Sequence, residues 1–297
     1  MKVTVAKALG TCFGVQDAID LALDPAYRDK LTVIGQLVHN PQTVESLLEN
    51  GVKIIDKLES GISTKAVMIT AHGAPDSVRG KAEAMGHRVI NATCPLVIRV
   101  HKAIAEYVRA GYHPVVIGQA SHVEVKGIIG DLTEYTVIAG PDEIVKLAGK
   151  PKLGIVCQTT QQIDFVRSLL TQIRETYPDA EVAFTDTVCQ PTKDRQVAVR
   201  ELASQVDLMI VIGGYNSSNT KKLKLVCDEF GVESYHVERA SELQQEWFDG
   251  HNHVGITAGT STPYEVIEEV YEALLDIPQV QDEQCSGLPE RPKYVHD

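Results

Sequence analysis

The chain has 297 residues, of which 43% are hydrophobic, 23% charged and 5% aromatic, and its formal net charge is −12. This length is long for one compact core and suits two or three units. The acidic balance argues against a general nucleic-acid binder, apart from a local basic patch, and no apolar run approaches the ~18–20 residues of a membrane span.

The N-terminal segment enters a strand pattern at once, without the apolar region of a signal peptide or an Arg-rich transit segment. We therefore expect a cytoplasmic protein. Because thiols stay reduced in that compartment, the six cysteines are poor evidence for disulfides. None forms a Cys-x-x-Cys pair, so they are either scattered core residues or ligands that the fold brings together.

Strand and helix patterns alternate along the chain. Strands are predicted, in chain order, at 3–6, at the starts of segments 31–47 and 66–75, at 88–91 and 114–117, at the start of 153–162, at 208–212 and at the start of 254–263. Asn40 and Pro41 form an expected N-cap and first-turn pair, and helical stretches are expected to end at Gly51, Gly111, Gly149 and Gly231.

An internal repeat organises these elements. Segments 31–47, 113–128 and 208–223 each contain an apolar strand ending in Ile-Gly, a polar loop and a helix start. Their glycines Gly35, Gly118 and Gly213 follow Cys12, Cys94 and Cys189 by 23, 24 and 24 residues. A second strand and polar loop follow in each case. Chance is unlikely to place three cysteines in one register.

The repeat predicts an α/β fold of three quasi-equivalent units with small parallel sheets around a pseudo-threefold axis. Continuously apolar strands such as 208–212 are typical of a parallel sheet that helices cover on both faces. We expect units at 13–93, 94–187 and 188–275, with the N-terminal strand in 1–12 joining the third unit and 276–297 forming a C-terminal tail.

Three cysteines point to a metal cluster. Cys12, Cys94 and Cys189 lie where strands end and helices begin, which is the functional edge of a parallel sheet. Structural zinc usually takes four ligands, often in close pairs, and such pairs are missing. A central cuboidal iron–sulfur cluster suits three equivalent thiolates, and its remaining iron is then free to act as a Lewis acid. Alternatively, each cysteine is a small buried hydrophobic residue.

Polar loops at the same strand ends predict an anion pocket. They carry His39 and Asn40, His72, His122 and Glu124, residues 158–160, residues 216–219 and residues 260–262. Their central positions hold no Lys or Arg, so imidazole, hydroxyl and amide groups in front of helix N-termini would bind the anion, and a diphosphate would suit. Helix capping is the alternative for any one Ser or Asn, but it does not explain three histidines.

Glu124 is the only carboxylate among these central loop positions. Near a bound anion and away from water its pKa is expected to rise, which would fit the side chain for donating a proton. The alternative is an exposed glutamate at the start of a helix.

Nine motifs, taken in this order, resemble the LytB/IspH family of 4-hydroxy-3-methylbut-2-enyl diphosphate reductases, which are iron–sulfur enzymes of isoprenoid synthesis. The motifs are GTCFGV (10–15), LVHNPQTV (37–44), TAHGAP (70–75), ATCPLV (92–97), SHVEVKG (121–127), QTT (158–160), CQPTKDRQ (189–196), NSSNT (216–220) and TAGTSTP (257–263). The resemblance extends from residue 3 to about residue 275, and the set is highly specific.

The resemblance implies a set of site residues. A 4Fe-4S cluster would be bound by Cys12, Cys94 and Cys189, with one iron not bound by a protein thiolate and open to the substrate hydroxyl. The family's diphosphate ligands fall on His39, His72, His122, Ser217, Ser218, Asn219 and Ser261. Its proton-delivering acid falls on Glu124, and the threonine that contacts the substrate hydroxyl falls on Thr159.

The resemblance also implies a reaction. It is the last step of the non-mevalonate isoprenoid pathway, a two-electron reductive dehydroxylation that converts the allylic diphosphate to isopentenyl and dimethylallyl diphosphate. The partners are the small-molecule substrate and an external electron donor, such as ferredoxin or flavodoxin. No nucleic acid and no membrane is expected to take part.

The chain departs from the family pattern at two loops. Family members often have Gly-Phe-Cys where this chain has Gly10-Thr11-Cys12. The family's Gly-His-x-x-His-Pro-Glu-Val becomes GQASHVEV at 118–125, which loses a histidine and a proline but keeps His122 and Glu124. Cys157 and Cys227 are expected in the core, and Cys285 has no assignable role.

Two other functions fit parts of the pattern. A quinolinate-synthase-type lyase or condensing enzyme also has three α/β units that each give one cysteine, but its dicarboxylate substrate calls for basic loop residues, which are missing. A zinc-stabilised repeat protein that only binds a phosphorylated ligand is the second alternative.

Overall fold

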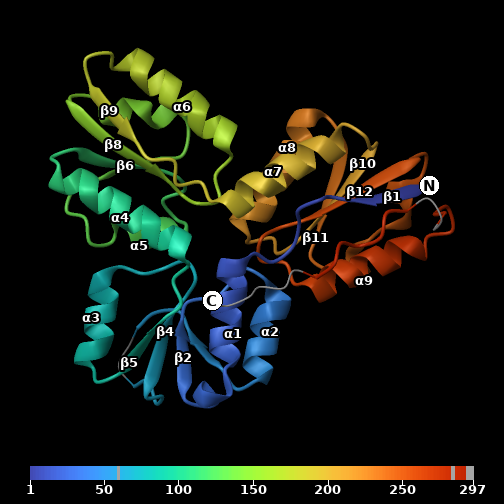
Figure 1. The fold of residues 1–297 in the computed structure, drawn as a ribbon, viewed down its shortest axis with the longest axis horizontal. Coiled ribbons are helices and arrows are strands. Elements are labelled where there is room, and N and C mark those ends of the chain that lie inside the picture. Colours follow the sequence, from blue (N-terminus) through green and yellow to red (C-terminus); the bar gives the residue numbers. More distant parts are fainter. Residues whose placement is uncertain (59–60, 282–284, 292–297) are drawn as a thin grey trace. The chain divides into compact units, whose positions relative to one another are not determined.

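A computed structural model describes residues 1–58, 61–281 and 285–291. In these residues the chain forms three four-stranded parallel sheets with helices packed against them (Figure 1). The prediction of an α/β fold with small parallel sheets is thereby confirmed, while the pseudo-threefold axis stays a prediction. Within the same residues, no helix has both the length and the apolar character of a membrane span.

Contacts divide the chain into two compact units. The first unit comprises Met1–Gln16, His39–Thr43 and Gln190–Asp297, and the second comprises Asp17–Val38 and Val44–Cys189. The first holds one sheet and the second holds two. The expected boundaries at 13–93, 94–187 and 188–275 remain predictions about the repeat.

The first unit is built on a sheet with the strand order β1-β12-β10-β11. Its strands are β1 (Lys2–Val5), β10 (Leu208–Ile212), β11 (Glu233–Val237) and β12 (His253–Ala258). The helices are α7 (Gln190–Ala203), α8 (Ser218–Phe230) and α9 (Tyr264–Leu275), with short 3-10 turns at Ala240–Glu242 and Gln245–Phe248.

Both faces of this sheet are covered. Leu208, Ile210 and Ile212 of β10 pack in one cluster with Val266 and Val270 of α9. The intervening Met209 and Val211 pack with residues of α7 and α8 on the other face. In Figure 1 these two helices lie across the sheet from α9. Alternate side chains of a strand point to opposite faces, so a strand covered on both sides must be apolar throughout. This accounts for the continuous apolar run 208–212.

The second unit holds the other two sheets. One has the order β3-β2-β4-β5, from β2 (Leu31–Ile34), β3 (Lys53–Ile55), β4 (Ala66–Ile69) and β5 (Arg88–Asn91). The other has the order β7-β6-β8-β9, from β6 (His113–Ile117), β7 (Thr136–Ile138), β8 (Lys152–Cys157) and β9 (Glu181–Phe184). The helices are α1 (Phe13–Leu23), α2 (Pro41–Glu49), α3 (Asp76–Ala84), α4 (Pro95–Arg109), α5 (Val123–Ile129) and α6 (Ile163–Thr176), with 3-10 turns at Pro25–Tyr27 and Pro141–Leu147; the first residues of α1 and α2 belong to the first unit.

All three sheets repeat one topology. In each, the first strand of the repeat lies between the second and the third, and a fourth strand lies beside the third. The fourth strand is β5 in one sheet and β9 in the next, and β1 takes this place in the sheet of the first unit. Cys94, Cys189 and Cys12 follow these three strands, so the cysteine register of the sequence corresponds to a repeated position in the fold.

Helix ends follow the predicted signals. The Asn40 side-chain oxygen accepts a hydrogen bond from the Thr43 N–H at 2.9 Å, and Pro41 begins α2. Gly231 follows α8 with φ of 74°, where its N–H bonds back to the last turn. Along α4 the buried residues Val97, Val100 and Ile104 recur at helical spacing and form the stripe that faces the core. The predicted helix ends at Asn40, Pro41 and Gly231 are confirmed.

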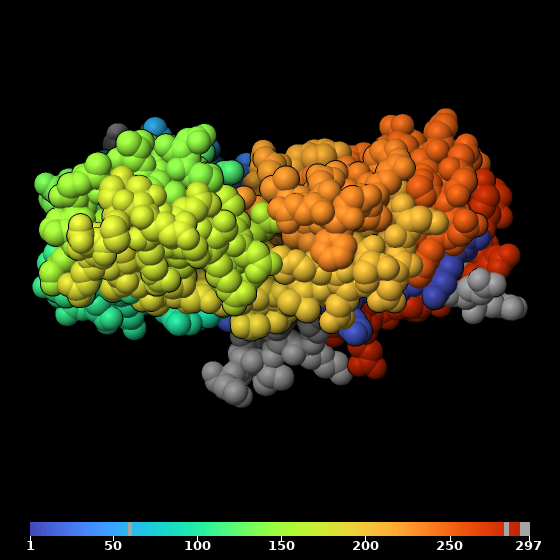
Figure 2. All heavy atoms as spheres, turned by 90° about the horizontal axis from the view of Figure 1, so that it is seen from above, coloured from blue at the N-terminus to red at the C-terminus, as the bar shows by residue number. Residues whose placement is uncertain are grey.

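The described part of the tail lies along β1. The Ser286 N–H donates to the Val3 carbonyl at 3.0 Å, and the Val5 N–H donates to the Ser286 hydroxyl at 2.9 Å. The Val3 N–H also contacts the Cys285 sulfur at 3.3 Å. Figure 2 shows the blue N-terminal segment against red C-terminal residues. Since β1 is an edge strand, this segment protects its unpaired backbone groups. Cys285 takes part through its sulfur, which contacts the Val3 N–H.

Candidate active site

The Cys12 loop connects β1 to α1 in the first unit. The Cys12 N–H donates to the Thr260 carbonyl at 3.1 Å, and the Cys12 carbonyl accepts from Gln16 at 2.9 Å, which places Cys12 at the start of α1. Burial raises the pKa of the Cys12 thiol. The Arg195 charge and the amides at the start of α1 act in the opposite direction, as expected for a helix N-terminus.

Five of the seven predicted diphosphate ligands belong to the first unit, and close contacts connect four of their positions. The Ser261 hydroxyl lies 3.4 Å from the Ser217 hydroxyl and 3.5 Å from the His39 carbonyl oxygen. The Asn219 side-chain oxygen accepts from the Thr260 N–H at 2.9 Å. The structure therefore brings the Ser217 and Ser261 hydroxyls, the Asn219 amide and the backbone of His39 together from three separate segments. Ser218, the first residue of α8, lies next to them in sequence.

The helix α8 begins at this group of polar side chains. Ser217 caps it, because its hydroxyl accepts from the Thr220 N–H at 3.3 Å. A hydroxyl that accepts a capping bond still has a proton to donate, and the start of a helix carries partial positive charge. Burial, followed by the Lys221 charge, lowers the pKa of His39, so its imidazole is neutral at pH 7. These uncharged donors suit an anion, and the positive charge of Lys221 lies close enough to act on His39.

A glycine allows two loops of this cluster to approach each other. A Cβ atom on Gly214 would lie 2.4 Å from the His39 carbonyl oxygen, which is backbone and cannot turn aside. Only glycine therefore fits between β10 and α8 at this point.

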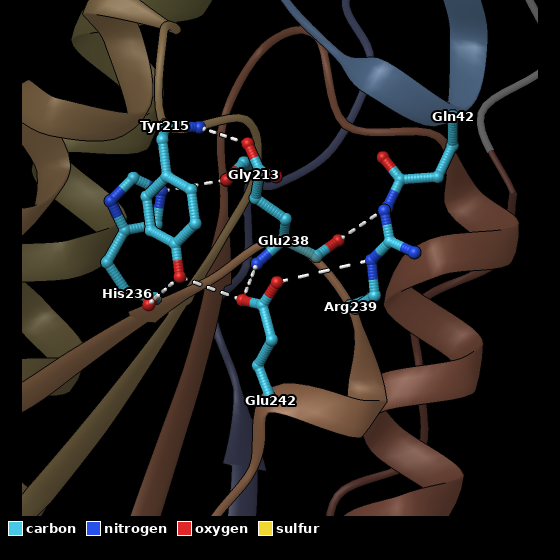
Figure 3. A network of polar contacts seen from close by, with 7 residues as sticks. All are labelled: Gln42, Gly213, Tyr215, His236, Glu238, Arg239 and Glu242. Atoms are coloured by element: carbon cyan, nitrogen blue, oxygen red, sulfur yellow. Dashed lines mark hydrogen bonds and ion pairs between the residues drawn. The ribbon is translucent and has the colours of Figure 1, made fainter. Parts of the chain in front are cut away.

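A hydrogen-bonded network holds the loop at residues 213–217 (Figure 3). We call it the loop network, and its members are Gln42, Gly213, Tyr215, His236, Glu238, Arg239 and Glu242. The Tyr215 N–H donates to Glu238 at 2.6 Å, and the Tyr215 hydroxyl donates to Glu242 at 2.8 Å. Burial and the bond to Glu242 raise the pKa of Tyr215 to about 12, so the phenol remains a donor.

Two further bonds attach the network to its surroundings. The His236 Nε2 atom lies 2.7 Å from the Gly213 carbonyl oxygen, so this nitrogen carries the proton and donates. The Gln42 amide donates to the Glu238 carbonyl at 2.8 Å, which links the loop network to the start of α2, next to His39 and Asn40. The two loops that carry these polar groups, at 39–40 and 213–217, are thus held by β11 and the turn after it.

Glu124 and Thr159 form the centre of the polar site in the second unit. Glu124 lies at the start of α5 and is 2% exposed. Its two oxygens accept from the Thr159 N–H at 2.6 Å and from the Thr159 hydroxyl at 2.8 Å. Burial raises the pKa of Glu124 to about 7, although both bonds from Thr159 favour the carboxylate and oppose the rise. The expected direction of the pKa shift is confirmed.

His122 and His72 lie beside this centre. His122 caps α5, because its Nδ1 atom accepts from the Glu124 N–H at 3.2 Å, which leaves the proton of the neutral ring on Nε2. The His72 and His122 rings are 6.0 Å apart in an edge-to-face arrangement. The second unit therefore brings together two predicted ligands and both predicted catalytic residues.

Two cysteines are bonded to the same region. The Cys189 N–H donates to the Thr159 carbonyl at 2.9 Å, and the Cys94 N–H donates to the Ala71 carbonyl at 3.1 Å, next to His72. Cys94 is the N-cap residue of α4, and Cys189 directly precedes α7. Each cysteine is fixed through its backbone to a strand-end loop that carries polar site residues.

The comparisons with known proteins agree on one family. The model of the family described as "LytB protein" matches residues 3–275. The chain belongs to the LytB family. The resemblance found in the sequence is confirmed.

Relatives and solved structures support this membership. A 4-hydroxy-3-methylbut-2-enyl diphosphate reductase from Trichlorobacter lovleyi is 41% identical over 276 residues, which cover 92% of this chain and 98% of the relative. A solved (E)-4-hydroxy-3-methyl-but-2-enyl diphosphate reductase has a TM-score of 0.66 at 37% identity, covering 93% of this chain and 100% of its own. The reductase from Plasmodium falciparum has a TM-score of 0.89 at 26% identity, covering 99% of this chain and 95% of its own. The lyase and zinc-protein alternatives are not favoured.

LytB proteins are iron–sulfur enzymes, and the donor set of this chain fits such a group. Cys12, Cys94 and Cys189 are partly exposed, and each directly precedes a helix. Cys157 and Cys227 are fully buried in apolar clusters, as expected for core residues. Among the residues that the structure describes, no three His, Cys, Asp or Glu side chains are grouped as a metal site. Cys12 belongs to the first unit and the other two predicted ligands to the second, so their convergence stays a prediction.

Sequence reasoning assigned no role to Arg195, although it lies in the LytB motif at 189–196. This arginine is 7% exposed and its guanidinium donates to backbone carbonyls of the Cys12 loop. One signal was available, because Arg195 shares the buried stripe of α7 with Thr192, Val199 and Leu202, where apolar residues are expected. The loop network carried no comparable signal.

Proposed function

We propose that this chain reduces 4-hydroxy-3-methylbut-2-enyl diphosphate to isopentenyl and dimethylallyl diphosphate, the terminal step of the non-mevalonate pathway. The substrate takes up two electrons and two protons. Its allylic C–O bond breaks, the hydroxyl group leaves as water with one proton, and a carbon of the allylic skeleton takes the other. Membership of the LytB family and the names of the relatives support the proposal.

The main structural support for this reaction is the buried environment of Glu124. A general acid works best when its pKa lies near the working pH, and burial brings the pKa of Glu124 to about 7. The side chain is then protonated in a substantial fraction of molecules and can take up a new proton after each turnover. In this proposal Glu124 delivers the proton and Thr159 contacts the substrate hydroxyl.

Thr159 is suited to orient both groups. Its hydroxyl proton is directed at Glu124, 2.8 Å away, so the oxygen lone pairs remain to accept from the substrate hydroxyl. Its N–H holds the other Glu124 oxygen at 2.6 Å. The carboxyl group is thereby fixed in one orientation while the hydroxyl of Thr159 faces the leaving group.

The diphosphate is proposed to bind neutral donors. Its proposed ligands are His39, Ser217, Ser218, Asn219 and Ser261 of the first unit and His72 and His122 of the second. The start of α8 adds backbone donors and the positive end of a helix dipole. Neutral donors hold a diphosphate in both substrate and product without a strong charge that would slow product release.

The proposed cofactor is a 4Fe-4S cluster bound by Cys12, Cys94 and Cys189, with one iron free of protein thiolate. When bound, it supplies the two electrons and a Lewis-acidic iron for the allylic hydroxyl. Thiolate is the ligand that such clusters require, and the partly exposed positions of these three cysteines suit it better than the buried Cys157 and Cys227. An external donor such as ferredoxin or flavodoxin and a cytoplasmic location complete the proposal.

An anaerobic assay tests the proposal. The purified chain is given dithionite and the hydroxylated allylic diphosphate, iron is measured, and products are identified by mass spectrometry. We expect iron near four atoms per chain, from the 4Fe-4S stoichiometry, and both isomeric diphosphates. Iron-replete protein that forms neither product would overturn the function, and colourless protein with zinc would overturn the cofactor.

A further inference from the structure

The buried guanidinium of Arg195 joins α7 to the loop before Cys12, within the first unit. Its Nε atom donates to the Gly10 carbonyl at 3.1 Å, and its Nη2 atom reaches the Leu9 and Thr11 carbonyls at 3.4 Å each. Its Nη1 atom donates to the Pro191 carbonyl at 2.9 Å. One side chain thus contacts three successive carbonyl groups that end directly before a proposed cluster ligand.

This arrangement requires an arginine. Guanidinium is a rigid planar fork with five N–H donors, whereas the ammonium of lysine is a single point of charge on a flexible stem. The loop itself turns sharply, because Gly10 has φ of 76° and a Cβ atom there would lie 2.8 Å from Ile267. The carbonyls converge on the fork as a result of this turn.

Two more bonds fix the loop on its other side. The Thr11 hydroxyl donates to the Thr262 carbonyl at 2.8 Å, and the Cys12 N–H donates to the Thr260 carbonyl. Ser261, a proposed diphosphate ligand, lies between the two acceptor residues, Thr260 and Thr262. Arg195 completes the hold on the Cys12 loop from the side of α7.

The charge of Arg195 also lies close to Cys12. Its guanidinium is buried and donates to the Gly10 and Thr11 carbonyls, so a positive charge is held against the backbone that directly precedes the cysteine. Because Arg195 is 7% exposed, solvent screens this charge weakly. Reduction adds negative charge to an iron–sulfur cluster, and nearby charge and hydrogen bonds set the reduction potential of such clusters.

We propose that Arg195 is a positioning residue that fixes the Cys12 loop and whose buried positive charge makes the cluster easier to reduce. The inference rests on the proposed function, since it concerns a cluster bound at Cys12. It assigns to this arginine two separable effects, one on loop geometry and one on the reduction potential.

Two substitutions separate the effects. Arg195→Gln removes the charge and most of the fork, and Arg195→Lys keeps the charge but not the fork. The matched control is Arg200→Gln, which removes an equal charge five residues further along α7, about 7.5 Å away along the helix axis. Anaerobic redox titration of each iron-loaded variant measures the potential, and amide hydrogen exchange of residues 9–12 measures the loop.

In Arg195→Gln we expect reduction to be at least tenfold less favourable, which is a fall of about 59 mV for a one-electron couple. Arg195→Lys should stay within threefold of wild type in that equilibrium, while exchange of residues 9–12 becomes about tenfold faster or more. Arg200→Gln should change neither quantity by more than threefold. This pattern would establish both roles.

Other results overturn the inference. An unchanged potential in iron-replete Arg195→Gln removes the electrostatic role, and unchanged exchange in Arg195→Lys removes the positioning role. If Arg195→Gln does not fold, the exchange measured in Arg195→Lys decides. Either failure leaves the proposed function standing as long as wild type turns over substrate, whereas wild type without iron would end both.

Discussion

The two units of this molecule use different chemical groups at their sheet ends. The first unit gathers neutral donors in front of α8, where the pKa of His39 is lowered and Ser217 and Asn219 are buried. The second unit carries a buried carboxyl group, Glu124, whose pKa is raised to about 7. In the proposed function the donors in front of α8 bind the diphosphate and Glu124 delivers a proton, while His72 and His122, two further proposed ligands, lie beside Glu124 in the second unit. Burial and the bonds from Thr159 set the pKa of Glu124 within the second unit, so the acid does not depend on the donors in front of α8.

Removing a thiol should have the largest effect, because the proposed reaction depends on the cluster. Cys94→Ser should lose most of its iron and all measurable turnover, since serine is a poor ligand for iron–sulfur iron. Iron content and visible absorbance measure the loss. Cys285→Ser, in the tail beside β1, is the matched control and should keep its cluster. A full, stable cluster in Cys94→Ser would remove this residue from the ligand set.

The proposed role of Glu124 in proton delivery is tested by Glu124→Gln. The amide keeps the shape of the carboxyl group but does not titrate, so turnover should fall by about 10²–10⁴-fold, the usual contribution of a general acid. Cluster absorbance and KM should change little. Glu106→Gln, at an exposed position of α4, should behave as wild type. Near-normal turnover in Glu124→Gln would assign the proton to another donor.

The raised pKa of Glu124 predicts a pH dependence. An acid must be protonated to act, so kcat should be constant at low pH and fall as pH rises through about 7. Thr159→Val removes a donor to the carboxylate, which destabilises the charged form. The falling limb should then move to higher pH by about 1 pH unit if that bond is worth ~1.4 kcal/mol. A limb that stays in place or moves to lower pH would contradict the assignment.

The first unit should respond in binding rather than in chemistry. Ser217→Ala removes a proposed donor to the diphosphate. A hydrogen bond to a charged group is worth ~1.5–3 kcal/mol, so KM should rise about tenfold or more with kcat nearly unchanged. The same change removes the cap of α8, at a cost of ~1 kcal/mol in the free energy of unfolding. Ser204→Ala, at an exposed position after α7, should change neither KM nor stability. A fall in kcat with KM unchanged would contradict the assignment of Ser217 to substrate binding.

The sequence predicted features that depend on local pattern or on the repeat. It placed Cys12, Cys94 and Cys189 at equivalent strand ends, Asn40 at a helix cap and Glu124 where its pKa rises, because periodicity and short motifs determine these positions. It did not predict contacts between distant segments. The Arg195 bonds to the loop before Cys12, and the pairing of Ser286 with Val3, join residues that are far apart in the chain and have no pattern that marks them as partners.

The loop network belongs to this second class, and its removal should have the smallest effect. Glu238→Ala removes the acceptor of the Tyr215 N–H, 2.6 Å away, and so loosens the loop at 213–217. The loop keeps its bond from His236 to Gly213 and the cap by Ser217, so KM should rise only about threefold, or ~0.7 kcal/mol by the usual conversion. The exposed Glu246→Ala serves as the matched control for lost charge in the first unit and should leave KM unchanged. Since the network contacts the anion loops and not the reacting carbon, kcat should hold in Glu238→Ala; a drop in kcat with normal KM would mean that these loops also orient the substrate for proton transfer.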